Sequence, residues 1–411
     1  MGTAAGIDLQ GMRQLAEALI AAPSPNLPGD ERAVAGVITD ALESRGLPAP
    51  RTIAKEAERP NLLTTIDFGP GGRHLCLCGH MDTKPVGPAE WDTDPFEPTV
   101  EGDRLYGLGA CDMKAALAAI IEAAAALDDV AGGRLSLLFT ADEEHMAVYG
   151  ARFLAESQVL EADAVVIGEP GGMEHDWDRL HLLSRGIANF TLHVFGDQGH
   201  SSLSDQKLMV NASLNMARLL VACSEEFRPE ARPHPLVPGG PTVNPGVKVS
   251  GGVNFGVFPG HASFSCDVRT LPGMSRADFE GDIERWLKQQ EENIPDLRAR
   301  VEFEPEPSGW LPATEVDGDA PLVEAVAESL REALGGVPPK AAFPGTTDAA
   351  WLQGVAGIST LPAVGPGMLE NAHRANEFVS LAALEKAPFI YAGIAQRFCP
   401  VQPRETRSRS E

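Results

Sequence analysis

Positive charge is scarce in this sequence. Of its 411 residues, 33 are Lys or Arg and 58 are Asp or Glu, which gives a formal net charge of −25. The basic residues gather only in the short segment 404–409. Because such a chain repels phosphate groups, we expect neither nucleic acid nor an anionic membrane as a partner.

Cysteine and long apolar runs are also rare. Six cysteines are too few for a disulfide scaffold, and we expect them to be reduced and buried in a cytoplasmic protein. The longest run of small apolar residues, 115–127, contains Glu122 and is too short to span a bilayer. The first residues lack a basic region followed by an apolar run, so we expect no secretion signal.

The first half of the chain alternates predicted helices with short apolar strands. Hydrophobic residues make up 43% of the sequence, which excludes a disordered chain, and the length favours two domains over one. Helices are predicted at residues 12–22, 33–45 and 112–127, and buried strands at 74–78, 134–140 and 164–167. This order predicts an α/β fold with a mostly parallel sheet and helices on both faces.

The pattern changes between residues 184 and 306, where the predicted elements follow a β-α-β-β-α-β order. This order is typical of a ferredoxin-like α+β domain. After residue 307 the α/β pattern returns, with a helix at 321–334. We therefore predict one domain built from residues 1–183 and 307–400, a second domain inserted at 184–306, and a disordered tail at 401–411.

Seven acidic or imidazole side chains stand in five short motifs. They are His80 and Asp82 in GHMDT, Asp112 in GACDMK, Glu143 and Glu144 in TADEEH, Glu169 in IGEP, and His373 in NAHRANE. Three of the motifs directly follow a predicted strand, and ligand sites in open α/β sheets form at the carboxyl ends of strands. We therefore expect these side chains to converge at one edge of the sheet.

Each motif alone has a simpler interpretation. A strand-end Asp often caps a helix, a single His is often structural, and adjacent acids often lie on a solvated face. Together, however, the carboxylates and imidazoles would repel each other or lose hydration unless a cation joined them. Zinc accepts both ligand types, and five ligands with one shared carboxylate suit two ions. Of the two residues left over, Asp82 would accept a hydrogen bond from the second ring nitrogen of His80, and Glu143 would act as a general base on metal-bound water.

The motifs occur in an order that resembles a known enzyme family. The series GHMDT, WDTDPFEPTVEGDRLYGLGACDMK, DEE, GEP, GHSS, DVRTLPG, GTTDAAWL and NAHRANE is similar to the di-zinc family of acetylornithine deacetylase, succinyl-diaminopimelate desuccinylase, aminoacylase-1 and carboxypeptidase G. The similarity covers nearly the whole chain, from about residue 16 to residue 396. The segment 91–114 looks most like the acetylornithine deacetylase branch.

The resemblance implies a ligand set. His80 and Glu169 would hold one zinc ion, Glu144 and His373 the other, and Asp112 would bridge the two, followed by a cis peptide bond. Zinc is the default metal, with cobalt and manganese as alternatives.

The same resemblance implies roles beyond the metals. Glu143 would be the general base, and Asp82 would orient His80. Residues 184–306 would form a lid and dimerisation domain of a homodimer, set into the catalytic domain. In that dimer His200 of GDQGHSS would reach the active site of the partner subunit and stabilise the oxyanion.

Substrate-binding residues are implied in two further motifs. Arg269 of DVRTLPG would bind the substrate carboxylate, with a structural ion pair to Asp267 as the alternative. The glycine-rich loop Gly345, Thr346 and Thr347 would contact the same carboxylate. Where many members of the family carry Asn before the lid proline this chain has Gly256, and Asn254 on the same strand face is the candidate replacement.

These observations predict a di-zinc hydrolase that cleaves the amide bond of an N-acyl amino acid, in the manner of acetylornithine deacetylase. Two alternatives stay open. One is a dipeptidase, aminopeptidase or carboxypeptidase of the same family, and the other is a homologue that binds metal without catalysis. Because the metal set and the base are all present, the enzyme is favoured over the binding protein.

Overall fold

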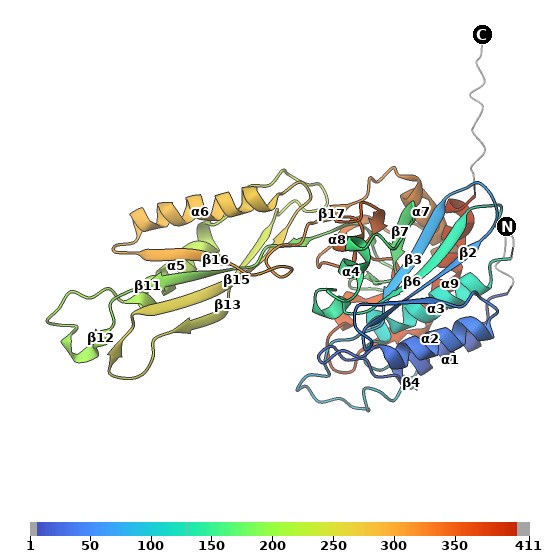
Figure 1. The fold of residues 1–411 in the computed structure, drawn as a ribbon, viewed down its shortest axis with the longest axis horizontal. Helices are drawn as coiled ribbons and strands as arrows, with labels where there is room; N and C mark the ends of the chain where they lie inside the picture. Colours follow the sequence, from blue (N-terminus) through green and yellow to red (C-terminus); the bar gives the residue numbers. More distant parts are fainter. Residues whose placement is uncertain (1–5, 129, 401–411) are drawn as a thin grey trace, which may run out of the picture. The chain divides into compact units, whose positions relative to one another are not determined.

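The computed structural model describes residues 6–128 and 130–400, which divide into two compact units (Figure 1). Of these described residues, the first unit contains those up to Ser184, then Glu315–Phe343, and then those at 347–400. The second unit contains Arg185–Thr314 and Pro344–Thr346. The predicted tail, 401–411, lies outside the described residues. Within the described part, no helix is long and apolar enough to cross a membrane.

A six-stranded sheet forms the centre of the first unit. Its order is β1 (Arg51–Ala54), β2 (Pro60–Asp67), β6 (Arg134–Thr140), β3 (His74–His80), β7 (Ala164–Ile167) and β19 (Ser359–Leu361). The four strands from β6 to β19 are parallel, whereas β1 and β2 are antiparallel additions at one edge. Every residue of β3 is buried. Since successive side chains point to opposite faces, both faces of the sheet are covered at β3.

Helices pack around this sheet. They are α1 (Leu9–Ile20), α2 (Arg32–Ser44), α3 (Ala115–Ala125), α4 (Ala151–Glu156), α7 (Pro321–Leu334), α8 (Ala349–Leu352) and α9 (Leu381–Phe398). The alanine-rich α3 is almost wholly buried, and its small side chains let it pack against α1, α9 and strand β3. Local signals fix the helix ends: Asp8 caps α1, Ser380 caps α9, and α7 begins with Pro321 and ends at Gly335 with φ 80°.

Short strands complete the first unit. They are β4 (Thr99–Glu101), β5 (Arg104–Tyr106), β8 (Pro170–Gly172), β9 (Leu180–Ser184), β18 (Lys340–Phe343), β20 (Gly365–Met368) and β21 (Phe378–Ser380), and β17 (Thr314–Glu315) lies where the chain returns to this unit. The β21–β5 and β20–β8 pairings bring the C-terminal part of the chain beside segments from its first half.

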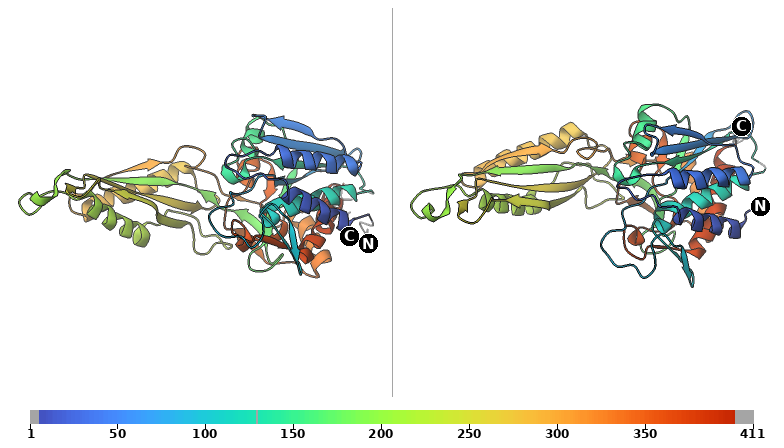
Figure 2. Two further views of the ribbon diagram at one scale, coloured as in Figure 1. Left: turned by 90° about the horizontal axis from the view of Figure 1, so that it is seen from below. Right: turned by 60° about the horizontal axis from the view of Figure 1, so that its bottom comes forward.

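The second unit is a sheet with two helices. Its main strands have the order β13 (Thr242–Gly251), β15 (His261–Thr270), β11 (Phe190–Phe195) and β16 (Arg298–Phe303), and β10 (Gly186–Ile187) also pairs with β15. Inward-facing residues of the strands share one core with α5 (Ala212–Glu226) and α6 (Arg276–Asn293), so both helices cover the same face (Figure 2). A small two-stranded antiparallel sheet, β12 (Gly199–His200) with β14 (Val257–Phe258), carries the start of the GHSS motif.

Most predicted elements match the structure closely. The predicted bounds of β6, β7 and α7 are those of the structure. The helix predicted at 112–127 starts later, because Asp112 and Met113 have non-helical backbone angles before α3 begins. The second unit also runs past the predicted end at residue 306, since Leu311 pairs with Ile187 there.

Candidate metal centre

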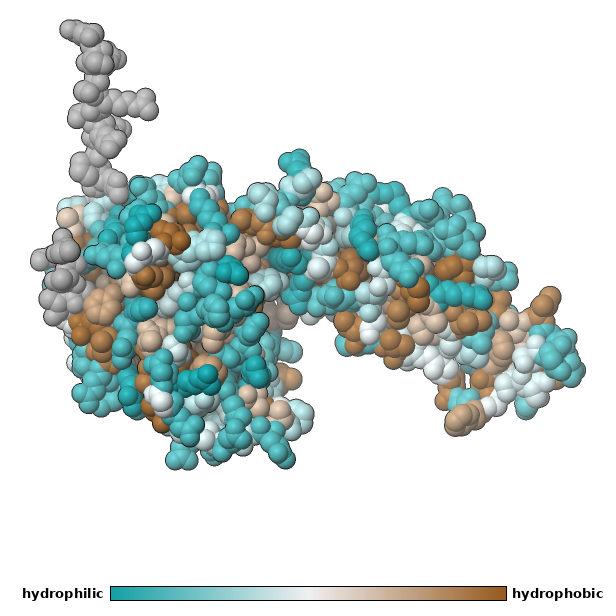
Figure 3. All heavy atoms as spheres, turned by 180° about the vertical axis from the view of Figure 1, so that it is seen from behind, coloured by the Kyte–Doolittle hydropathy of each residue, from teal (hydrophilic) through white to brown (hydrophobic). Residues whose placement is uncertain are grey.

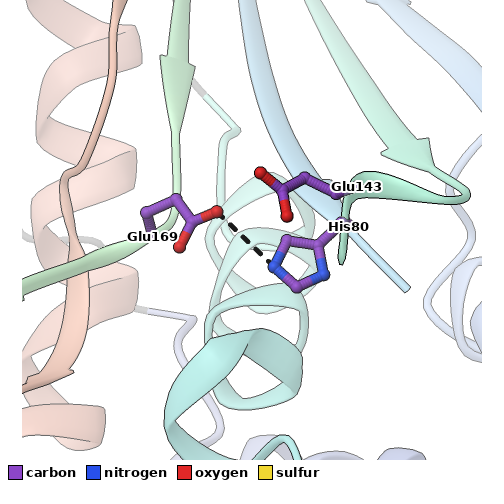
Figure 4. Close-up of side chains that lie close together, drawn as sticks. All are labelled: His80, Glu143 and Glu169. Carbon is purple, nitrogen blue, oxygen red and sulfur yellow. Dashed lines mark ion pairs between the residues drawn. The ribbon is translucent and has the colours of Figure 1, made fainter. Parts of the chain in front are cut away.

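Three parallel strands bring the candidate ligands to one edge of the sheet. His80 is the last residue of β3, Glu143 follows β6, and Glu169 follows β7. Because β6, β3 and β7 are neighbours in the sheet, their carboxyl ends lie side by side. The side chains of His80, Glu143 and Glu169 point toward one another, with ligand atoms within 4.8 Å (Figure 4).

Asp112 divides its two oxygens between two groups of ligands. Its Oδ1 lies 2.9 Å from His80 Nε2, which is also 3.5 Å from Glu169 Oε1. Its Oδ2 lies 3.1 Å from His373 Nε2, which is also 3.1 Å from Glu144 Oε1. The peptide bond after Asp112 is cis. The candidate ligands therefore form two halves: His80 with Glu169, and His373 with Glu144. The two halves share the carboxylate of Asp112, and this arrangement suits two metal ions.

The chemistry of this donor set fits divalent cations. Burial would lower the pKa of His80, but hydrogen bonds with carboxylates, foremost Asp112, raise it well above its usual value. Burial would also lower the pKa of His373, but its hydrogen bonds with Asp112 and Glu144 raise that pKa to about 10. Burial and the charge of Asp112 raise the pKa of Glu169 to about 8. The cluster thus retains protons that a bound cation would replace.

Asp82 organises the backbone that carries the two adjacent glutamates. Its carboxylate accepts hydrogen bonds from the backbone amides of Glu143 and Glu144, each at 3.1 Å. His80 Nδ1 lies 3.0 Å from the backbone oxygen of Asp82 and 3.6 Å from its carboxylate. The predicted contact between the Asp82 carboxylate and His80 is therefore present at longer range than the hydrogen bonds from the 143–144 turn.

Glu143 lies beside the candidate metal ligands, where its carboxylate could accept a proton. Its side chain is partly buried, and no hydrogen bond or ion pair of its carboxylate is found among the described residues. Burial, followed by the charge of Glu169, raises the pKa of Glu143 well above its usual value. A general base at neutral pH needs a raised pKa of this kind.

A second carboxylate fixes the backbone at Asp112. Glu377, at the end of the NAHRANE motif, accepts hydrogen bonds from the backbone amides of Cys111 (2.9 Å) and Asp112 (3.0 Å). Burial, followed by the charge of Asp112, raises the pKa of Glu377 to about 8. One short segment thus supplies both His373 and the residue that positions the shared ligand.

Behind Asp82 lies a buried polar network. Asn26 Nδ2 donates to Asp82 Oδ2 (2.8 Å) and to Asp142 Oδ1 (2.9 Å). Arg59 pairs with Glu31 at 2.7 Å and with Asp142 at 2.9 Å. All five residues are buried. The network links the residues just before α2 and just before β2 to the turn that carries Glu143 and Glu144.

Sequence reasoning did not assign a role to the positioning residues. Asp142 and Glu377 stand inside the TADEEH and NAHRANE motifs. Because they are close in sequence to the candidate ligands, a positioning role could have been predicted for them. Asn26, Glu31 and Arg59 are far from every motif in the chain, and only the fold brings them to the site.

The predicted substrate residues lie mostly in the second unit. His200 is exposed, and its Nδ1 lies 2.8 Å from Ser202 Oγ. Asn254 is exposed, and its side chain accepts a hydrogen bond from Phe255 N. Arg269 donates to Asp267 at 3.0 Å, so the ion pair considered as its alternative role is formed.

The glycine-rich loop is divided between the units. Gly345 accepts a hydrogen bond from the backbone amide of Arg185, and Thr346 Oγ1 donates to the backbone oxygen of the same residue. Both contacts lie within the second unit. Thr347 belongs to the first unit, where it is buried and accepts from Ala349 N.

A model of peptidase family M20/M25/M40 matches residues 76–397, a range that includes the whole candidate centre. The chain belongs to this family. It is therefore a metal-dependent hydrolase that acts on amide bonds. The family resemblance inferred from the motifs is confirmed.

Curated relatives point to two named activities. The chain is 31% identical over 360 residues to an acetylornithine deacetylase of Photorhabdus laumondii, covering 86% of this chain and 85% of the relative. It is 30% identical over 407 residues to a succinyl-diaminopimelate desuccinylase of Phenylobacterium zucineum, covering 94% and 97%.

Solved structures share the fold at lower identity. An M20 family metallo-carboxypeptidase of Sulfolobus solfataricus aligns with a TM-score of 0.74 at 19% identity, covering 95% of this chain and 99% of that one. The aminopeptidase PepT of Bacillus cereus gives the same TM-score, identity and coverage. A dinuclear metal-binding peptidase of Bacillus subtilis aligns at 0.66 and 19% identity, covering 94% and 96%.

Proposed function

We propose that this M20 hydrolase removes the acyl group of an N-acyl amino acid, as acetylornithine deacetylase does, with two divalent metal ions in each subunit. The observation that carries the proposal is the shared carboxylate of Asp112, with one histidine and one glutamate on each side. The deacetylase and desuccinylase names of its relatives support an acyl amino acid as substrate. Zinc is the expected metal, with cobalt or manganese as alternatives.

Glu143 is the proposed proton carrier. Divalent ions, when bound, supply Lewis-acid activation of water and of the scissile carbonyl. The raised pKa of Glu143 lets its carboxylate take a proton from the attacking water and then give it to the leaving amine. Asp82 serves this step by holding the backbone amides of Glu143 and Glu144 in place.

The second unit is proposed to bind substrate and a second copy of the chain. Arg269 would exchange its Asp267 partner for the substrate carboxylate, and His200 would complete the partner subunit's site. Asn254, Gly345 and Thr346 of this unit, and Thr347 of the first unit, would be further substrate contacts. Exposed hydrophobic side chains on β13 and α5, among them Val249 and Val221, support a dimer through this unit. Figure 3 shows hydrophobic residues exposed on the surface of the second unit.

A substrate panel tests the proposal. The purified protein is loaded with Zn²⁺ or Co²⁺ and supplied with N-acetyl and N-succinyl amino acids and, separately, with dipeptides and tripeptides. Release of free amino acid from an acylated substrate is expected. Cleavage of peptides alone would establish the second candidate, which the peptidase names of the structural neighbours favour. If the fully metal-loaded protein hydrolyses none of these substrates, the result would favour the alternative of a homologue that binds metal without catalysis.

A further inference from the structure

Lys84 brings a positive charge to the edge of the candidate metal centre. It lies two residues beyond Asp82, just after β3, in the segment GHMDTK. Its Nζ is 2.9 Å from Glu144 Oε2 and also donates to the backbone oxygen of Glu144. Its side chain is 37% exposed, whereas that of Glu144 is 4% exposed. The ammonium group therefore reaches a buried candidate ligand from the surface.

The two oxygens of Glu144 have different partners. Oε1 lies 3.1 Å from His373 Nε2 and faces the half of the centre that contains Asp112 Oδ2. Oε2 forms the ion pair with Lys84 Nζ. In the other half, no Lys or Arg of the described chain forms an ion pair with Glu169, whose carboxylate contacts His80. The two halves thus differ in charge, because only the glutamate of the Glu144 half is paired with a lysine ammonium group.

We propose that Lys84 is a positioning residue that holds Glu144 as a one-oxygen ligand and weakens divalent-cation binding in the half formed by Asp112, Glu144 and His373. This inference rests on the proposed two-metal function. The ammonium reserves one oxygen of the carboxylate and repels a second cation placed beside it. The charge repulsion acts against the support that partners of metal ligands usually give to metal binding, and we infer that the repulsion is the larger effect here.

Unequal loading of the two halves follows. The half with His80 and Glu169 binds its cation first, because no neighbouring ammonium opposes that ion. The half with Glu144 and His373 fills only at higher metal concentration. Lys84 therefore sets the metal concentration at which the two-metal form appears.

Calorimetric titration of metal-free protein with Co²⁺ tests this inference without substrate. The wild type should bind two ions in separate steps, the second weaker. Lys84→Met removes the like charge, and we expect it to tighten the second step by about tenfold while changing the first by less than about threefold. The visible absorption of the second Co²⁺ should also change, because Glu144 is then free to bind through both oxygens.

Two further variants serve as controls. Lys84→Arg keeps the charge and should retain the weak second step. Lys386→Met removes one charge from an exposed position on α9 and should leave both steps as in the wild type. Thermal unfolding of each variant confirms that it is folded.

An unchanged second step in Lys84→Met, or an equal tightening of both steps, would overturn the inference. So would two wild-type steps of equal strength. Because the titration needs no catalysis, a failure to hydrolyse acyl amino acids would count against the proposed function alone.

Discussion

One residue, Asp112, decides how the candidate centre is divided. Its two carboxylate oxygens face different histidines, at 2.9 and 3.1 Å, and its backbone amide is held by Glu377. A carboxylate fixed at both its backbone and its oxygens has little freedom to turn. The spacing between the two metal halves is therefore set largely by this one side chain.

Glu143→Gln should separate metal binding from catalysis. Glutamine has nearly the same shape as glutamate but cannot accept the proton of the attacking water. General acid–base groups contribute about 10²- to 10⁴-fold to rate, so we expect a fall in kcat of that order. Elemental analysis should still find two metal ions per subunit, because Glu143 lies outside the proposed ligand set.

The matched control for this variant is Glu385→Gln, which removes one exposed carboxylate from α9. It should keep wild-type kcat and metal content. Normal turnover in Glu143→Gln would remove Glu143 from the role of base, and loss of metal would make it a ligand instead.

Single site residues were predictable from the sequence where an acidic or imidazole side chain stands at the end of an apolar strand. His80 and Glu169 stand at or directly after apolar strands, so their convergence followed from the parallel sheet. Asn26 and Arg59 carry no such signal. Their hydrogen bonds to Asp82 and Asp142 join positions 56 and 83 residues apart, and only the folded chain brings them together.

The turn after β6 is the element that carries both the proposed base and a ligand. Asp142 opens it with φ 64°, a left-handed conformation that Asp tolerates because its short side chain bonds locally. Here Oδ2 accepts from Tyr149 N, while Oδ1 accepts from Asn26 and Arg59. The turn is therefore fixed from several directions by buried groups.

Arg59→Met should destabilise this element strongly. It would leave the carboxylates of Glu31 and Asp142 buried without their cation, and breaking a buried ion pair costs about 3–5 kcal/mol. Burial already raises the pKa of Glu31 to about 7, with Arg59 opposing the shift. Because the folded protein would then favour protonated Glu31 even more, the loss should be greater at about pH 8 than at about pH 5.

Urea unfolding of the variant at both pH values measures this loss. The double variant Glu31→Gln, Arg59→Met removes one of the stranded charges and should recover part of the stability. A loss below about 1 kcal/mol at both pH values would show that the network is not a buried ion cluster in solution.

Strand β13 is the second element with a testable role. It pairs with β15 alone in the described part of the chain, and Val249 at this edge is 58% exposed. Val249→Lys places a charge in the proposed dimer contact, so we expect a monomer by analytical ultracentrifugation. If His200 acts in the partner's site, the monomer should also lose most turnover.

Val355→Lys, at an exposed valine of the first unit, is the matched control and should remain a dimer. A dimer that survives Val249→Lys unchanged would place the contact elsewhere.

The elements themselves were predictable where hydrophobic periodicity is strong. Strands β6 and β7 and helix α7 have the predicted bounds. Strands β1 and β2 were missed, because the mixed polar sequence of this hairpin lacks a long apolar run. The start of α3 was misplaced for a different reason: Asp112 has extended backbone angles while it contacts both histidines, which overrides helix propensity.

The acidic charge of the molecule disfavours phosphate-rich partners and favours bound cations. Two divalent ions would change the formal charge only from −25 to −21, so most of the excess lies away from the centre. The fold gathers a small part of that charge, Asp82, Asp112, Glu143, Glu144 and Glu169, into one buried cluster. The stability of the molecule should therefore depend on what neutralises this cluster.

Removal of metal should lower the melting temperature, and the effect should grow with pH. In the metal-free protein the pKa of His373 is raised to about 10 and that of Glu169 to about 8, so the fold is more stable when both groups are protonated than when they are not. That stability is present at low pH and is lost as pH rises through these values, whereas metal binds deprotonated ligands. A metal present at about a hundred times its Kd adds about 2.7 kcal/mol. Calorimetric melting with and without chelator should therefore show a larger difference at about pH 8 than at about pH 6, and an equal difference at both would mean that protons and metal do not compete for this cluster.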